Sequence, residues 1–125
     1  MQYQNKVYEL GDVKNQKNFA ANFIKSIDTT DILESNIQHF KPLKGEEFDG
    51  LYVKFKEGEK LVTQVIPFSS TSSKLSNFVA DSCTMRCESS TWCRGCAITI
   101  IEKCKQINCE CTSGMGACDP KISFP

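Results

Sequence analysis

All eight cysteines of this 125-residue chain lie within residues 83–125, and residues 1–82 contain none. A segment as short as 83–125 cannot bury a large hydrophobic core, so it usually needs disulfides or bound metal ions to hold a fold. An even number of clustered cysteines favours four disulfides confined to this segment. The cysteines that we expect to form them are Cys83, Cys87, Cys93, Cys96, Cys104, Cys109, Cys111 and Cys118.

Thiolate binding of zinc or copper is the first alternative to disulfides. Cys93 and Cys96 have the C-x2-C spacing of a structural zinc pair, which the other cysteines lack. The single histidine, His39, lies outside the cysteine-rich segment, and we expect it on the surface of a helix. We therefore predict disulfides, with no metal and no other cofactor. Four disulfides indicate an oxidising compartment, so we expect a secreted or otherwise extracytoplasmic protein.

Thiol–disulfide redox chemistry at Cys93 and Cys96 is the second alternative. The run from Trp92 to Cys96 resembles the Trp-Cys-x-x-Cys site of thioredoxin-like proteins, in which the first thiolate lies at a helix N-terminus. The chain that follows Cys96 is too short for the remaining elements of that fold. We therefore interpret these residues as two disulfide cysteines beside a core tryptophan.

The cysteine-rich segment is predicted to form a helix followed by a β-hairpin. Cys93, Cys96 and Cys104 fall on one stripe of a helix over 92–105. The run from Ser113 to Gly116 is a strong turn signal between two short strands. If these four residues form the hairpin loop, Cys111 lies opposite Cys118, close enough for a disulfide. We predict this pair, and we expect Cys109 to bond to a cysteine of the helix.

The cysteine-free part of the chain reads as a small β-α-α-β-β unit. Apolar residues at spacings of three and four indicate helices, one of them with Asp31 and Glu34 at capping-box spacing, and alternation indicates a hairpin. The elements expected are a strand at 3–10, helices at about 14–27 and 31–40, and a hairpin at 51–68. The predicted fold class is therefore α+β. Its three parts are a domain at 1–68, a Ser/Thr connector with a short helix at 69–82, and a cysteine-rich module at 83–125.

Charge and motifs exclude several classes of function. The chain has 15 basic and 15 acidic residues, so it lacks the basic field of a nucleic-acid-binding protein. Its apolar runs are too short for a transmembrane helix. The surroundings of His39 show no nucleophile motif, and the sequence has no phosphate-binding loop. We therefore expect a non-enzymatic monomer that binds an unknown protein or cell-surface target.

The layout of the chain resembles that of secreted bacteriocin precursors with a cysteine-rich C-terminal peptide. The resemblance lies in the cysteine-free half, which ends in Val65-Ile66-Pro67-Phe68-Ser69-Ser70, in the Ser/Thr connector, and in the eight-cysteine tail. It implies an antimicrobial or target-binding peptide at the C-terminus. It also implies that the N-terminal half serves as a pro-region or partner module.

Overall fold

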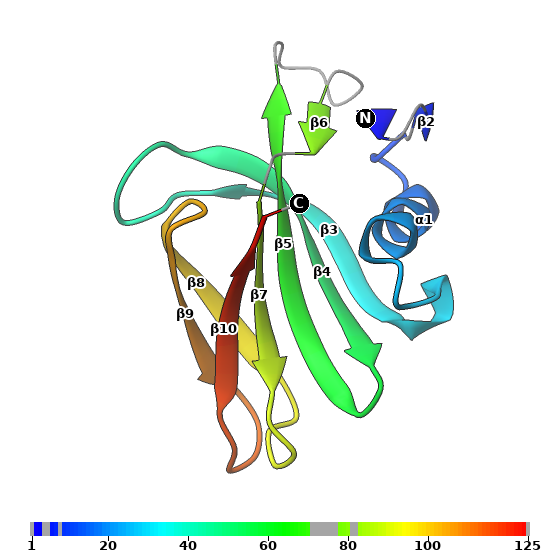
Figure 1. Ribbon diagram of the computed structural model, residues 1–125. Helices are drawn as coiled ribbons and strands as arrows, with labels where there is room; N and C mark the ends of the chain where they lie inside the picture. Colours follow the sequence, from blue (N-terminus) through cyan, green and yellow to red (C-terminus); the bar gives the residue numbers. More distant parts are fainter. Residues whose placement is uncertain (1, 4–5, 8, 71–77, 81–82, 125) are drawn as a thin grey trace.

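The structure is a computed structural model that describes residues 2–3, 6–7, 9–70, 78–80 and 83–124. It is mostly antiparallel β-sheet, and α1 is the only α-helix among these residues (Figure 1). The elements are β1 (Gln2–Tyr3), β2 (Lys6–Val7), α1 (Val13–Ile24), the 3-10 turn η1 (Thr29–Asp31), β3 (Ile32–Phe40), β4 (Phe48–Glu57), β5 (Lys60–Ser70), β6 (Phe78–Ala80), β7 (Thr84–Ser89), β8 (Cys96–Glu102), β9 (Gln106–Cys111) and β10 (Cys118–Ser123).

The central sheet has the antiparallel strand order β3-β4-β5-β7-β10. The far end of β5 also pairs with β6, which lies parallel to β1, and β1 pairs with β2. Because β5 pairs with β7 from Val62 to Val65, the cysteine-free and cysteine-rich parts of the chain share one sheet. The division of the chain at 68 and 83 into separable units stays a prediction, which limited proteolysis can test.

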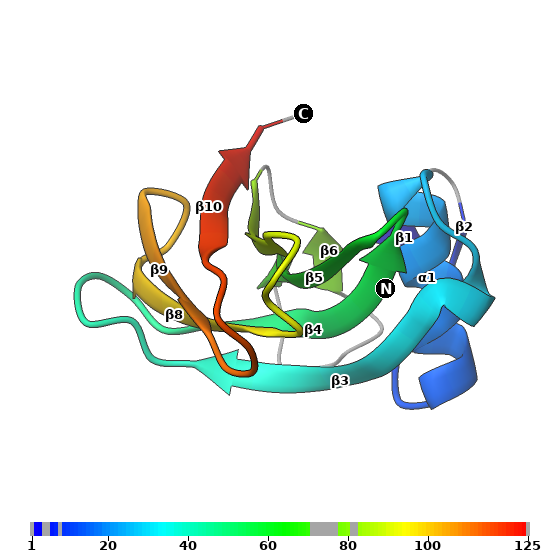
Figure 2. The ribbon, with the colours of Figure 1, turned by 90° about the horizontal axis from the view of Figure 1, so that it is seen from below.

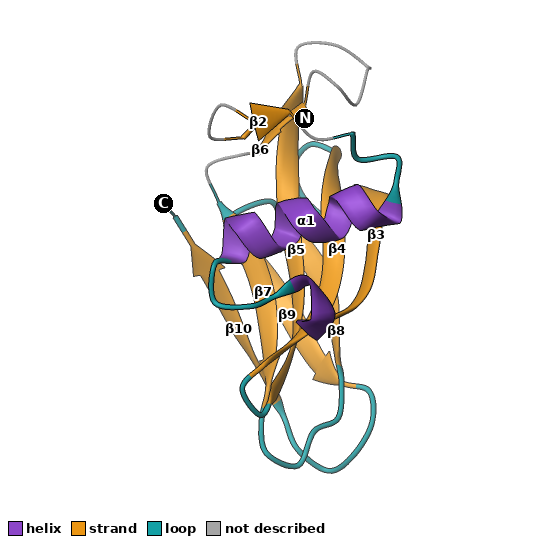
Figure 3. Ribbon diagram, turned by 90° about the vertical axis from the view of Figure 1, so that its right-hand side faces the viewer, coloured by secondary structure: helices purple, strands orange, loops and turns teal. Residues whose placement is uncertain are grey.

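Helix α1 covers one face of the sheet, as Figure 3 shows. The side chain of Asp12 caps the helix by accepting a hydrogen bond from the Lys14 backbone N–H at 2.9 Å. Phe19 is fully buried between the helix and the sheet. The strand residues that it meets alternate with residues of the opposite face, as the pleat requires. The hydrophobic core between α1 and the sheet consists of the buried residues Leu10, Phe19, Ala20, Ile27, Ile32, Leu51, Val53, Phe55, Val62, Ile66 and Phe68.

The β8–β9 hairpin packs on the opposite face of the sheet and lies away from α1 in the view of Figure 2. Val65 and Met85 of the sheet are fully buried against Ile100 and Ile107 of the hairpin. The hydroxyl of Thr63 also donates a hydrogen bond of 2.8 Å to a carbonyl oxygen at the start of β8. The fold therefore has three layers: the helix, the sheet and the hairpin.

This architecture corrects the predicted α+β class, and the helix predicted at 31–40 is wrong. The segment is strand β3, where Ile32 pairs with Phe55, and Ile37 pairs with Leu51. The predicted capping box of Asp31 and Glu34 is replaced by one of Asp28 and Asp31, in which the N–H of Asp28 donates to the carboxylate of Asp31 at 2.8 Å, and it closes only the single turn η1. Pairing with β4 buries apolar surface that an isolated helix would leave exposed, and it outweighs the local signal.

The predicted C-terminal helix and the hairpin after it are also wrong. Residues of the supposed helix form β8, where consecutive β-branched side chains from Ile98 to Ile101 favour a strand. The strands β9 and β10 do not pair with each other: β9 pairs with β8, and β10 pairs with β7. The loop between them therefore passes from the hairpin layer to the sheet.

The remaining predicted elements have mixed outcomes. The helix near 14–27 and the hairpin at 51–68 are present as α1 and as β4 with β5. The strand expected at 3–10 is replaced by the short β1–β2 pair. Most of the predicted connector, at 71–77, and residues 81–82 lie outside the described residues, whereas Phe78–Ala80 is a strand and not part of a helix.

Candidate functional site

All eight cysteines are paired within 83–118, as four disulfides. In chain order each of the first four cysteines bonds to the one four places later, and the Cα atoms of each pair are 5.6 to 6.0 Å apart. The pairs are Cys83–Cys104, Cys87–Cys109, Cys93–Cys111 and Cys96–Cys118. Three of them attach the β8–β9 hairpin to β7, to β10 and to the residue just before β7, and the fourth, Cys93–Cys111, attaches it to the β7–β8 loop.

The predicted Cys111–Cys118 disulfide is wrong, because the register that carried it is wrong. Cys111 ends β9, where it lies opposite Cys96 on β8, and Cys118 begins β10, where it lies opposite Ser89 on β7. The two cysteines therefore belong to different layers. The expected link from Cys109 to the helix is replaced by a link to Cys87 on β7.

Two loops meet at the end of the hairpin, and we call them together the tip: the β7–β8 loop (90–95) and the β9–β10 loop (112–117). Backbone hydrogen bonds of 2.7 to 3.2 Å join the loops, donated by the N–H groups of Arg94, Thr112 and Met115. Gly114 has a φ of +103°, and a Cβ there would collide with the carbonyl oxygen of Trp92. The disulfide Cys93–Cys111 joins the first loop to the end of β9, and Cys96–Cys118 joins β8 to β10 where these strands leave the loops.

The rigid backbone of the tip presents large side chains to solvent. Trp92 is 76% exposed and Met115 is 96% exposed, one on each loop. Arg94 is also exposed and lies two residues from Trp92. The prediction that this tryptophan belongs to the core is wrong. Aromatic, Met and Arg side chains are the types enriched in protein–protein interfaces, so the tip is the candidate functional site.

Sequence reasoning missed Met115 altogether and assigned Trp92 to the wrong environment. A usable signal was present for both. Met115 is a large apolar residue between Gly114 and Gly116, in a turn that has no core to enter. Trp92 follows Ser89-Ser90-Thr91 and precedes Arg94-Gly95, so its neighbours are polar or turn-forming residues.

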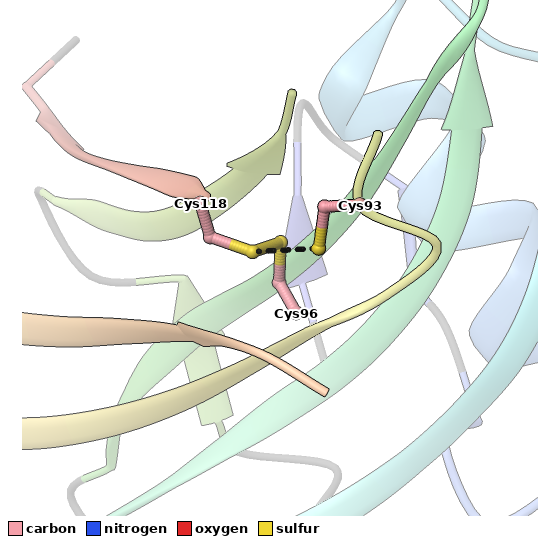
Figure 4. Close-up of side chains that lie close together, drawn as sticks. All are labelled: Cys93, Cys96 and Cys118. Atoms are coloured by element: carbon pink, nitrogen blue, oxygen red, sulfur yellow. Dashed lines mark hydrogen bonds between the residues drawn. A yellow bond between two sulfur atoms is a disulfide. The ribbon is translucent and has the colours of Figure 1, made fainter. Parts of the chain in front are cut away.

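The sulfur atoms beneath the tip form a compact group, drawn in Figure 4. The sulfurs of Cys93, Cys96 and Cys118 lie within 4.8 Å of one another, and all three residues are buried. The Sγ atoms of Cys93 and Cys118 are 3.5 Å apart although they belong to different disulfides. In this oxidised form none of the sulfurs is a thiolate, so metal binding would require reduction first.

Cys93 and Cys96 are not bonded to each other, and no helix begins at them. The thioredoxin-like interpretation needs both features, because the helix N-terminus stabilises the reactive thiolate. The interpretation of Cys93 and Cys96 as disulfide cysteines is confirmed, and the structure gives each of them a different partner.

His39 lies on β3, not on a helix, and is exposed between two carboxylates. Its Nε2 is 2.8 Å from Glu47 Oε1, and its Nδ1 is 2.8 Å from Asp49 Oδ1. Hydrogen bonds to Glu47 and Asp49 raise the pKa of His39 above its usual 6.5. Both ring nitrogens already have partners, and when the imidazole is protonated it forms ion pairs with Glu47 and Asp49.

The fold and the tip define a small, disulfide-rich β-protein with a preorganised exposed tip. Comparisons with protein-family models, curated proteins and solved structures gave no match. Among the described residues no helix is both long and apolar enough to cross a membrane.

Proposed function

We propose that this is a secreted, non-enzymatic protein that binds a protein target on a cell surface through the tip. The observation that carries the proposal is the exposure of Trp92 and Met115 on loops that two disulfides and several hydrogen bonds hold in place. Soluble proteins have little reason to fix large apolar side chains in solvent unless something covers them in use. A rigid binding surface also loses less conformational entropy on association.

A protein target fits the tip better than a lipid surface. Arg94 is the basic side chain of the tip, and Asp119 lies exposed nearby at the start of β10. A single cation gives little attraction to anionic headgroups. Trp, Met and Arg are instead enriched in protein–protein interfaces, and Trp and Arg are among the residues that contribute most of the binding energy there. Antimicrobial action of the bacteriocin type would be one consequence of binding such a target.

The test uses fluorescently labelled oxidised protein and a panel of bacterial cells, with cell binding and growth inhibition as readouts. Trp92→Ala should weaken saturable binding at least about 30-fold, as expected for a residue central to an interface. Leu43→Ala is the matched control, because Leu43 is 77% exposed but lies on the β3–β4 loop, away from the tip. Protease treatment of the cells should abolish binding.

Two outcomes would overturn the proposal. Equal binding by wild type and the Trp92→Ala variant would show that the tip is not the binding surface. Binding that survives protease treatment of the cells, together with binding to protein-free lipid vesicles, would show that the target is the membrane.

A further inference from the structure

We propose that Cys93, Cys96, Cys111 and Cys118, in and next to the tip, form a site of thiol–disulfide exchange, in which an external thiolate is the catalyst and a second disulfide pairing is the product. The observed pairs are Cys93–Cys111 and Cys96–Cys118. The alternative pairs are Cys93–Cys118 and Cys96–Cys111. This inference goes beyond target binding and does not depend on it.

The geometry of the sulfurs and strands supports both alternative bonds. Cys93 Sγ and Cys118 Sγ are 3.5 Å apart, which is about the separation of reacting atoms before attack. Cys96 and Cys111 are directly opposed on the β8–β9 ladder. Opposed residues of antiparallel strands have Cα atoms about 4.5–5.5 Å apart, within the range of disulfides. The second pairing therefore needs little movement of the backbone.

The exchange is a closed cycle that consumes no reductant. Cys111 is the only one of the four that is not buried, so an external thiolate attacks its Sγ and releases Cys93 as a thiolate. Cys93 then attacks Cys118 Sγ, which forms Cys93–Cys118 and releases Cys96. Finally Cys96 attacks Cys111 Sγ, which forms Cys96–Cys111 and expels the external thiolate. Two disulfides are present before and after, so the net change is isomerisation.

The second pairing changes which elements the disulfides link to each other. In the observed form Cys96–Cys118 ties the hairpin to β10 on the sheet. In the alternative form Cys96–Cys111 lies within the hairpin itself, and Cys93–Cys118 ties only the preceding loop to β10. A thiol that meets the tip can therefore release this end of the hairpin without reducing the protein.

The remaining two disulfides provide an internal control. Cys87 Sγ lies against the carbonyl oxygens of Ala97 and Asn108, at 3.8 and 3.9 Å, and its partner is Cys109. If Cys109 is removed, the released Cys87 therefore faces two carbonyl oxygens, whereas Cys93 faces the Sγ atom of Cys118 in addition to the Gly95 carbonyl oxygen at 2.9 Å. The structure assigns exchange to the tip and not to this disulfide.

The experiment incubates the folded, oxidised protein with a catalytic amount of reduced glutathione at pH 8, quenches with acid and maps the disulfides by mass spectrometry. Cleavage after Arg94 separates Cys93 from Cys96, and cleavage at Met115 separates Cys111 from Cys118. The expected result is Cys93–Cys118 together with Cys96–Cys111, while Cys83–Cys104 and Cys87–Cys109 stay intact. The rate should rise as the pH rises from 6 to 8, because the thiolate is the attacking species.

An unchanged map after prolonged incubation, or scrambling over all eight cysteines, would overturn the proposal. The second arm uses Cys111→Ser, in which exchange should move the free thiol from Cys93 to Cys96. Cys109→Ser is its control, and only Cys87 should be alkylated there. Labelling of Cys93 alone in a folded Cys111→Ser variant contradicts the relay. If that variant does not fold, the glutathione arm on the wild type decides.

Discussion

The two faces of the central sheet are stabilised in different ways. The face under α1 is closed by apolar burial, with Phe19, Leu51 and Phe55 almost fully buried and no cysteine in residues 1–82. The face under the β8–β9 hairpin contains a smaller cluster of apolar side chains, and next to the tip the buried cluster consists of cysteines. Burial stabilises the folded state, whereas disulfides act largely by restricting the unfolded chain.

The comparison explains why one chain can combine a conventional core with an exposed apolar tip. The tip has no core of its own from which to derive rigidity, so covalent links hold its backbone. Trp92 and Met115 are then free to face solvent, because neither is needed to stabilise the fold. The two regions should therefore respond to different treatments, and four experiments, from the largest expected effect to the smallest, test that difference.

Reduction of all four disulfides should have the largest effect on stability, and it should unfold the β8–β9 hairpin alone. Removing a native disulfide costs about 2–5 kcal/mol, so loss of all four should exceed what a small hairpin can retain from packing. We expect the amides of β8 and β9 to lose hydrogen-exchange protection in a phosphine reductant, while those of α1 and β4 keep theirs. Exchange measured by mass spectrometry checks this. Simultaneous loss of protection in α1 would show a single cooperative unit.

The substitution Phe19→Ala should act on the opposite face. Phe19 packs against Phe23 and Phe68 with ring centroids 5.7 and 6.4 Å away, and it has no exposed surface. Truncating a buried phenylalanine costs about 3–5 kcal/mol. We expect a loss of that size in chemical denaturation, with the disulfide map unchanged. Phe124→Ala, at an exposed position, is the control and should change stability by less than about 0.5 kcal/mol. A comparable loss in both variants would contradict the burial argument.

The parts of the fold that are predictable from the sequence are those formed by residues close together in the chain. Helix α1 and the β4–β5 hairpin follow from local patterns, because each is formed by residues close in the chain. The sheet order is not local, since β5 pairs with β7 and β7 pairs with β10 across long stretches of chain. Strand β3 was misread because its apolar spacing also fits a helix, and only pairing with β4 decides.

The disulfides illustrate the same limit at the candidate site. That the cysteines pair within 83–118 follows from their positions in the sequence, and the structure confirms it. Which cysteine bonds to which depends on strand register, and the register of Cys111 depends on β8 rather than on the adjacent turn. The polar neighbours of Trp92 indicate exposure, but its position beside the second loop depends on how the two loops meet, which no local pattern encodes.

Glu88 is a noncovalent link between the cysteine-free part of the chain, at β5, and the cysteine-rich part, at β7 and β10. Its buried carboxylate lies 3.0 Å from Lys121 Nζ, 3.2 Å from Arg86 and 3.3 Å from Lys60 Nζ, and so joins β5, β7 and β10. Burial alone would raise the pKa of Glu88, but hydrogen bonds from Lys121 and Lys60 and the nearby positive charges outweigh it and lower the pKa. Its contribution is therefore present above pH 4.5, the usual value, and is lost as the pH falls through the lower folded value.

We expect Glu88→Gln to cost roughly 1–3 kcal/mol at pH 7, because it removes the charge of a buried carboxylate that accepts part-buried hydrogen bonds from Lys60, Arg86 and Lys121. Denaturation curves at several pH values should show the wild type losing this advantage below pH 4.5. The matched control is Glu59→Gln, since Glu59 is exposed on the β4–β5 turn. An advantage that persists at pH 2 would show that packing, and not charge, is responsible.

Loss of the charge on His39 should have the smallest effect on stability. His39 lies close to the contact between the cysteine-free part of the chain and the β8–β9 hairpin. The β3–β4 loop contacts the end of β8 through a 2.8 Å hydrogen bond from the Lys44 N–H to the Ile101 carbonyl oxygen. His39 lies at the base of this loop, with hydrogen bonds to Glu47 and Asp49 that raise its pKa. A raised folded pKa means that the stabilisation is complete below pH 6.5 and is lost as the pH rises through the folded value.

Because His39 is the only histidine, its imidazole resonance can be titrated by NMR without ambiguity. We expect a pKa above 6.5 that falls in Glu47→Gln and, by a smaller amount, in Asp49→Asn, since the hydrogen bond to Glu47 is the larger cause. Added salt should lower the pKa as well, because the ion pair is exposed and is screened. Glu34→Gln, on the same strand but paired with Lys54, should leave the titration unchanged. An equal shift in all three variants would mean that the general acidity of the strand, and not this pair of carboxylates, sets the charge of His39.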